Sequence, residues 1–199
     1  MKSSTLLFIV FSTAVLSAAQ PVKSINNDSV QIRNTITAFY NWYNKNYTKF
    51  QSFTLYAGVK TKEGPPYKIN WKEAERYLVF LRTSVPWLGE EFIKNQRIFF
   101  KQCDSAFTVN TEDEIPYGFD YDWYTNSQEE PQWLADELKK SKQWVITVKG
   151  IDANVDVLGY YMEQGNKVET VVMCFVMKKE KAKWKIAKIG CAYEEPVKM

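Results

Sequence analysis

The sequence predicts an α+β fold, in which three N-terminal helices pack on a curved antiparallel sheet of about four strands. Two observations lead to this prediction. Apolar side chains recur every three or four residues up to about residue 102, whereas they alternate with polar ones from about residue 144 onwards. Because the helical and extended periods occupy separate parts of the chain, we expect the helices to cover one face of the sheet.

The first helix is predicted from Val30 to about Tyr47, after a polar segment that ends in a helix-capping residue. Its apolar positions lie three or four residues apart, which places them on one helix face. These positions are Ile32, Ile36, Phe39, Tyr40, Tyr43 and Tyr47. An extended segment at residues 53–59 and a Gly-Pro-Pro turn at residues 64–66 follow.

Two further helices are expected before the sheet. One begins after Asn70, because Glu73 stands at the capping-box spacing from it. The next runs from about Leu88 to Gln102. Residues 108–130 then have neither period, which predicts an unusually long loop, with a turn of helix at about residues 133–138.

The sheet is predicted where apolar and polar residues alternate. Trp144, Ile146 and Val148 have this pattern, as expected for a strand with one buried face. Longer strands are predicted at residues 167–178 and 182–192, and a short hairpin turn joins them.

Residues 1–19 have the three parts of a secretory signal peptide. Lys2 supplies the positive charge, residues 6–16 form an apolar core too short to span a membrane, and Ser-Ala-Ala at residues 17–19 is a small-residue cleavage site. We therefore expect an exported protein without a membrane span, whose mature chain, residues 20–199, is a single α+β domain.

The composition excludes several classes of enzyme. The chain has no histidine and only three cysteines, so it cannot form a Ser-His-Asp or Cys-His nucleophile, a histidine general base or the usual zinc sites. We expect no cofactor and no metal, and we favour a non-enzymatic protein. The formal net charge of +3 is too small to indicate a nucleic-acid partner. The oligomeric state is left open.

Three cysteines allow three disulfide pairings in an exported protein. Cys174 lies within an apolar run, Cys191 ends the last predicted strand, and Cys103 follows a predicted helix. We expect a Cys103–Cys191 disulfide, because it would tie the helices to the end of the sheet, and a buried free thiol at Cys174. In the alternative, all three thiols are reduced and packed.

Three apolar motifs resemble the nuclear-transport-factor-2-like superfamily and, within it, the exported bacterial family catalogued as domain of unknown function 3828. The resemblance covers roughly residues 29–192. The motifs are Phe39-Tyr40-Asn41-Trp42-Tyr43, Tyr77-Leu78-x-x-Leu81 and Lys183-Trp184-Lys185-Ile186-Ala187-Lys188-Ile189.

The resemblance implies a Gram-negative source, a periplasmic location and a cone-shaped fold whose mouth or interior can hold a small ligand. Enzymes of the superfamily usually place Asp, His or Tyr inside the cone, so their best-known sites cannot be carried over to a chain without histidine. Six side chains either line an open cone or fill a closed one, and we favour the filled cone. They are Tyr40, Tyr43, Trp144, Met162, Met173 and Met177.

The most distinctive segment is residues 111–138, which we call the acidic aromatic loop. It holds nine Asp and Glu residues and no Lys or Arg, whereas the segments on either side of it are basic. Six aromatic side chains are interleaved with these acids. They are Tyr117, Phe119, Tyr121, Trp123, Tyr124 and Trp133.

The acidic aromatic loop has three interpretations. Its aromatic side chains can simply hold a solvated loop against the helices. It can bind a basic partner, with its carboxylates steering the encounter and Trp123 and Tyr124 serving as anchors. It can also form a calcium or sugar site from Asp120, Asp122 and Asn126, although this spacing lacks most features of an EF-hand loop.

We favour a non-enzymatic binding protein, secreted or periplasmic, that recognises a basic exported protein or peptide. Its predicted ligand-binding residues are Asp120, Asp122, Trp123 and Tyr124. The alternative is a small-ligand-binding protein or a carboxylate-dependent enzyme that uses the interior of the cone. The lysines on the last predicted hairpin are interpreted as a solvated face that protects strand edges, with contact to anionic glycans or lipid headgroups as the alternative.

Overall fold

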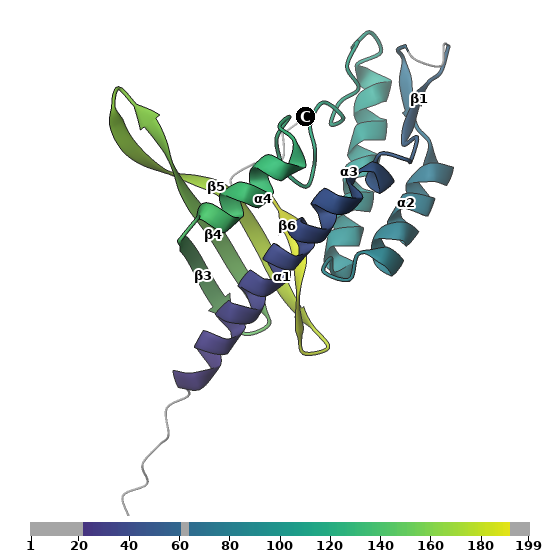
Figure 1. Cartoon of the computed structure of the whole chain (residues 1–199). Coiled ribbons are helices and arrows are strands. Elements are labelled where there is room, and N and C mark those ends of the chain that lie inside the picture. The colour runs from purple at the N-terminus through teal and green to yellow at the C-terminus, as the bar shows by residue number, and fades with distance from the viewer. Residues whose placement is uncertain (1–21, 61–63, 192–199) are drawn as a thin grey trace, which may run out of the picture.

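The structure is a computed structural model that describes residues 22–60 and 64–191, with only the backbone described for residues 22–26. The predicted signal peptide, residues 1–19, lies outside the described residues. The chain has an α+β architecture with four helices and two antiparallel sheets in these ranges (Figure 1). The predicted fold class is therefore confirmed at this level.

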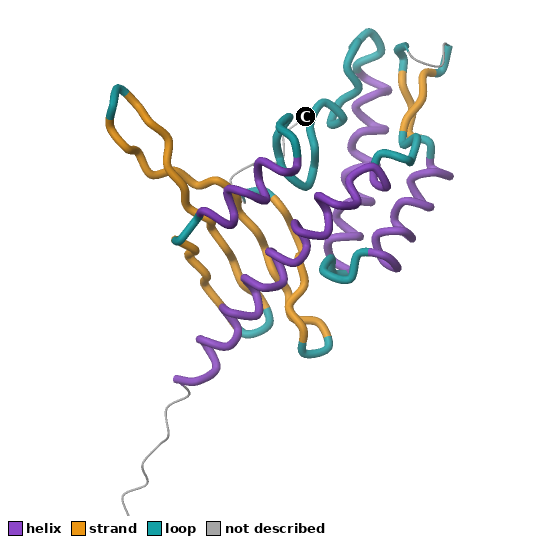
Figure 2. The backbone as a smooth tube through the Cα atoms, viewed as in Figure 1, coloured by secondary structure: helices purple, strands orange, loops and turns teal. Residues whose placement is uncertain are grey.

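The elements follow the predicted order, helices before the main sheet. They are α1 (Val22–Phe50), β1 (Tyr56–Gly58), β2 (Tyr67–Ile69), α2 (Trp71–Ser84), α3 (Glu90–Val109), α4 (Pro131–Lys140), β3 (Gln143–Lys149), β4 (Asp152–Glu163), β5 (Asn166–Glu180) and β6 (Lys183–Ile189). The four long strands form an antiparallel sheet in the order β3-β4-β5-β6, and β1 and β2 form a separate hairpin (Figure 2).

The sequence predicted that all the helices cover one face of the sheet, but the structure shows that they do not. Helix α1 lies across the sheet and contacts β6, β3 and α4, whereas α2 and α3 pack against each other beyond the β6 edge (Figure 1). The reason is a local pairing at that edge. Leu88 forms a parallel bridge with Ile186, supported by hydrogen bonds from Ile186 N to Trp87 O and from Gly89 N to Ile186 O, both of 2.9 Å. The α2–α3 connection thus satisfies polar groups of the edge strand.

The core is rich in aromatic side chains. Those of α1, α2 and α3 meet where the helices converge, and β5 contributes Phe175. Tyr40, Tyr43, Met173 and Met177, predicted to line or fill a cone, are all buried. Trp144 is half-buried. Met162 is 68% exposed, because β4 and β5 extend as a hairpin beyond the rest of the sheet (Figure 2).

The predicted Cys103–Cys191 disulfide is wrong. The structure has a Cys174–Cys191 disulfide, and Cys103 is a buried free thiol. The cause is the register of the last hairpin. Phe175 pairs with Ile189, and Gly190 N donates a 3.0 Å hydrogen bond to Cys174 O, so Cys191 follows directly beside Cys174. Cys103 instead faces the helical core from α3.

Two basic side chains of β5 connect the sheet to helices. Lys179 Nζ contacts Asp28 Oδ1 at 2.7 Å, and the indole of Trp184 donates to the same oxygen at 2.9 Å, which attaches the first half of α1 to the hairpin. Lys178 pairs with Glu91 of α3 at 2.6 Å. No helix of the described residues is both long and apolar enough to cross a membrane.

Candidate functional site

The acidic aromatic loop is anchored to helix α1 through Asp122. Oδ2 of Asp122 accepts a 2.6 Å hydrogen bond from the hydroxyl of Tyr43. Its Oδ1 accepts bonds from the backbone N–H groups of Tyr124, at 2.7 Å, and Thr125, at 3.3 Å. An aspartate that bonds to the backbone two and three residues ahead stabilises a turn. Asp122 therefore fixes the conformation of the loop and its position against α1.

Tyr124 lies in the core. It is 2% exposed, its carbonyl accepts a 2.5 Å bond from the Tyr40 hydroxyl, and its own hydroxyl lies 2.5 Å from that of Tyr77. Its ring packs against Tyr43 and Phe50 of α1, with both centroid distances at 4.9 Å. Tyr124 thus holds the loop between α1 and α2, as the first interpretation of the aromatic side chains requires.

Trp123 is half-buried and packs mainly against α3. Its ring makes edge contacts with Phe99 and Phe100 of α3 and with Phe119 of the loop. The indole N–H donates a 2.6 Å bond to Gly118 O. Gly118 adopts a φ of 78°, and a Cβ there would lie 2.6 Å from a ring atom of Phe99. This position therefore needs glycine for both its backbone conformation and its close approach to α3.

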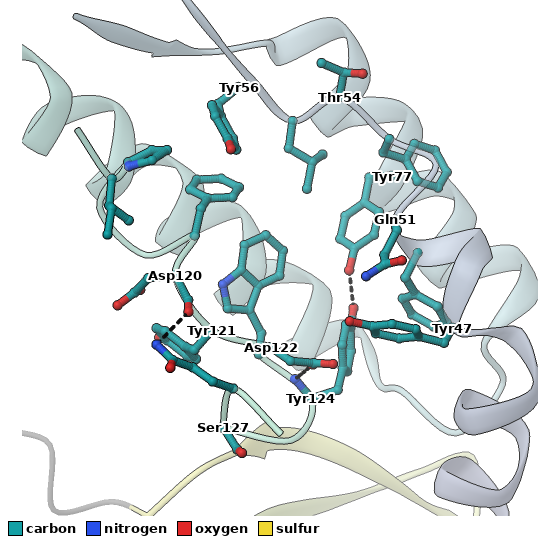
Figure 3. Close-up of a pocket in the computed structure, with 18 of the residues that line it drawn as sticks. Tyr47, Gln51, Thr54, Tyr56, Tyr77, Asp120, Tyr121, Asp122, Tyr124 and Ser127 are labelled. Atoms are coloured by element: carbon teal, nitrogen blue, oxygen red, sulfur yellow. Dashed lines mark hydrogen bonds between the residues drawn. The ribbon is translucent and has the colours of Figure 1, made fainter. Parts of the chain in front are cut away.

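A cleft of about 970 Å³ lies between this loop and the segment that follows α1 (Figure 3). One wall comes from Glu114 to Glu129 of the loop, and the facing wall from Thr54 to Ala57, in and just before β1. Eleven aromatic residues line it, from α1 and the segment after it, from β1, β2 and α2, and from the loop. They are Tyr43, Tyr47, Phe50, Phe53, Tyr56, Tyr67, Tyr77, Phe119, Tyr121, Trp123 and Tyr124.

All ionisable carboxyl and ammonium groups in the lining are of one sign. Glu114, Asp120, Asp122 and Glu129 line the cleft, whereas no Lys or Arg does. Within residues 22–60 and 64–191, none of these four carboxylates forms an ion pair. We call this feature the acidic cleft. If the loop were purely structural, we would expect these carboxylates to pair with lysines of the chain, and in the described residues they do not.

Burial shapes the electrostatics of the acidic cleft. Burial raises the pKa of Asp122, and its hydrogen bonds from Tyr43 and from the Tyr124 and Thr125 amides lower it by less. Burial, together with the Asp122 charge, also raises the pKa of Tyr43. Tyr43 therefore remains a hydrogen-bond donor at every physiological pH.

The four predicted ligand-binding residues do not act as one exposed patch. Asp120 is exposed, and its carbonyl accepts a 3.2 Å bond from Gln128. Asp122, Trp123 and Tyr124 contribute to the wall of the acidic cleft while fixing the loop. For the suggested calcium site, the described residues contain no group of three or more His, Cys, Asp or Glu side chains placed to hold a metal ion.

Sequence reasoning missed the facing wall. Tyr47 near the end of α1, and Gln51, Thr54 and Tyr56 beyond it, line the cleft opposite the loop (Figure 3). The cluster of aromatic and small polar residues between positions 47 and 57 is a visible signal, but only the tertiary fold brings it to residues 114–129.

The chain matches no family model, no curated protein and no solved structure with which it was compared.

Proposed function

We propose that the acidic cleft binds a cationic segment of a protein or peptide, and that the chain is an exported binding protein with no catalytic role. The observation that carries this proposal is the lining of the cleft, four carboxylates and no Lys or Arg. A guest with a positive charge gains from carboxylates that no cation of the described chain neutralises. A carboxylate guest would meet repulsion.

The aromatic lining supports the same class of ligand. Lysine and arginine side chains bring an apolar stem as well as a charge, and aromatic rings contact the stem and attract the cation through their faces. Tyr56, Tyr121 and Trp123 line the same cleft as Asp120 and Glu129. The nearest concrete role is that of an inhibitor or immunity-like protein acting on a basic exported partner. The proposed location is the periplasm or the secreted fraction, and the nuclear-transport-factor-2-like relationship is likewise proposed.

Binding of a defined peptide tests this function. The mature chain, residues 20–199, would be titrated with a labelled hexapeptide of alternating lysine and valine, and with its glutamate–valine counterpart. We expect only the lysine peptide to bind, with an affinity that falls as NaCl rises from about 50 mM to about 300 mM, because salt screens exposed charges. Equal binding of the two peptides, or binding of neither, would contradict the proposal.

A matched set of variants places the interaction. Asp120→Asn combined with Glu129→Gln removes two cleft charges without changing shape, and we expect a three- to tenfold loss of affinity, on the order of 1 kcal/mol. Asp113→Asn is the control, because Asp113 belongs to the same loop but does not line the cleft. An equal loss in the control would show that the cleft is not the binding surface.

The second candidate is a small-ligand-binding protein or a carboxylate-dependent enzyme. One observation favours it. Asp122 has a raised pKa at the wall of a cleft whose volume suits a small molecule. However, no residue of β3–β6 lines this cleft, so it is not the interior of a cone formed by the main sheet. Asp122 also directs its oxygens to Tyr43 and to loop amides. Loss of turnover in Asp122→Asn with peptide affinity retained would favour the enzyme.

A further inference from the structure

Strand β1 has one paired edge and one edge without a strand partner. Among the described residues, its sheet contains only β1 and β2, paired through Tyr56 with Ile69 and Gly58 with Tyr67. An edge strand presents a row of N–H and C=O groups that can accept another extended chain. The question is whether these groups face solvent or the acidic cleft.

The hydrogen bonds of the hairpin determine which residues point outwards. Leu55 O accepts a 2.9 Å bond from Asn70 N, and Val59 N donates a 2.8 Å bond to Pro66 O. In an antiparallel pair, alternate residues direct both backbone polar groups to the partner strand. Leu55 and Val59 therefore face β2, and Tyr56, which has the opposite parity to both, directs its N–H and C=O away from β2.

The acidic cleft runs along this unpaired edge. Successive side chains of a strand point to opposite faces, so a cleft that contacts only one face would be lined by every second residue. Tyr56 and Ala57, successive residues of β1, both line the acidic cleft, as do Thr54 and Leu55 just before the strand. The cleft therefore borders the backbone of β1 at Tyr56, and the acidic aromatic loop lies across the cleft from it (Figure 3).

We propose that the ligand is an extended peptide that adds to β1 as a third strand, with its cationic side chains directed at the carboxylates of the acidic aromatic loop. This inference rests on the proposed function and narrows its ligand class. Strand addition supplies affinity through backbone hydrogen bonds, and pockets for alternate side chains supply selectivity. Asp120 and Glu129 would select lysine or arginine, and the Tyr56, Phe119 and Tyr121 rings would contact the stems of these side chains. A lone organic cation would use the charges but not the strand edge.

N-methylation of the peptide separates these two cases. The lysine–valine hexapeptide would be compared with one version methylated at the backbone nitrogen of every lysine and another methylated at the backbone nitrogen of every valine. Because only alternate residues of a strand face the neighbouring strand, we expect one version to bind at least tenfold more weakly and the other to stay within threefold of the parent. Equal affinities for all three would overturn strand addition and leave cation recognition standing. Failure of the parent peptide to bind would overturn both.

A pair of protein variants tests the same edge from the other side. Tyr56→Pro removes the N–H that faces the cleft but keeps the bonds of Leu55 and Val59 to β2, and proline is tolerated on edge strands in this position. Tyr56→Ala is the matched control, since both variants lose the ring. We expect Tyr56→Pro to bind the parent peptide at least fivefold more weakly than Tyr56→Ala. Equal affinities in the two variants, with both folded by circular dichroism, would contradict the proposal.

Discussion

The hydroxyl of Tyr43 donates a 2.6 Å hydrogen bond to Oδ2 of Asp122, across 79 positions of sequence. This bond joins the C-terminal part of helix α1 to the acidic aromatic loop, and both residues line the acidic cleft. Because the same carboxylate caps the turn at Tyr124, one group sets both the conformation of the loop and its distance from α1. The shape of the cleft therefore depends on this contact.

Removal of the Tyr43 hydroxyl tests how strongly it holds the loop. We expect Tyr43→Phe to lower the free energy of unfolding by about 1–3 kcal/mol, since the partner carboxylate stays buried without its donor. Urea denaturation of the mature chain would measure this change. Tyr117→Phe is the control, because Tyr117 is exposed and donates no hydrogen bond in the described residues, and it should change the free energy of unfolding by less than about 0.5 kcal/mol. Equal effects of the two substitutions would show that the bond contributes little.

The raised pKa of Asp122 predicts a pH dependence with a definite sign. The folded protein binds the Asp122 proton more tightly than the unfolded chain, whose aspartate has a pKa of about 3.9. The stability contributed by Asp122 is thus fully present below that unfolded value and is lost as the pH rises through the folded pKa. The difference in unfolding free energy between wild type and Asp122→Asn should therefore fall as the pH rises from acid towards neutral. A difference that grows with pH would contradict this assignment.

Thiol reactivity distinguishes the observed disulfide from the one predicted from the sequence. Burial raises the pKa of Cys103 to about 12, so its thiol is protonated and shielded at neutral pH. Iodoacetamide should modify no cysteine of the native, unreduced protein and only Cys103 after denaturation without reductant. Peptide mass mapping would identify the modified residue. Modification of Cys174 under denaturing, non-reducing conditions would instead support the Cys103–Cys191 pairing.

Gly118 offers a test of the contact between the loop and α3. A Cβ at this position would meet the Phe99 ring at 2.6 Å and Cys103 Sγ at 3.1 Å, on a backbone with positive φ. We expect Gly118→Ala to cost about 1–3 kcal/mol of unfolding free energy. Gly165→Ala is the matched control, because it has a similar φ of 82° but no atom within 4 Å of the added Cβ. Thermal or urea unfolding would measure both variants. A loss of unfolding free energy in Gly118→Ala no larger than in Gly165→Ala would show that the contact with α3 contributes little to stability.

Local patterns predicted the elements well and their ends less well. The capping pair Asn70 and Glu73 marks the start of α2, where Asn70 Oδ1 accepts from Glu73 N. Helix α3 continues to Val109 rather than ending at Gln102, because Cys103 and Phe107 prolong its buried face. Cys103 lies three residues after Phe100, and Phe107 lies four residues after Cys103, a helical spacing that is visible in the sequence. The helical pattern therefore continues past Gln102, and following it to Phe107 would have predicted the end of α3 more closely.

The disulfide and the cleft depend on tertiary geometry that local patterns do not encode. The pairing of Cys174 with Cys191 follows from a hairpin register of Phe175 with Ile189. Predicting it requires both the turn position at residues 181–182 and the register shift between Val176 and Met177. The acidic aromatic loop was recognised from its composition. Its role as one wall of a cleft was not, because β1 lies more than 50 positions earlier in the chain.

We propose the acidic cleft as the working surface of this protein. A titration of ¹⁵N-labelled residues 20–199 with the lysine–valine hexapeptide, followed by assigned amide chemical shifts, tests this directly. We expect the shift changes to concentrate at residues 54–57 and 114–129 and at the indole N–H of Trp123. Shifts confined to the lysine-rich β5–β6 hairpin or to the projecting tip of β4 and β5, or no shifts at all, would contradict it.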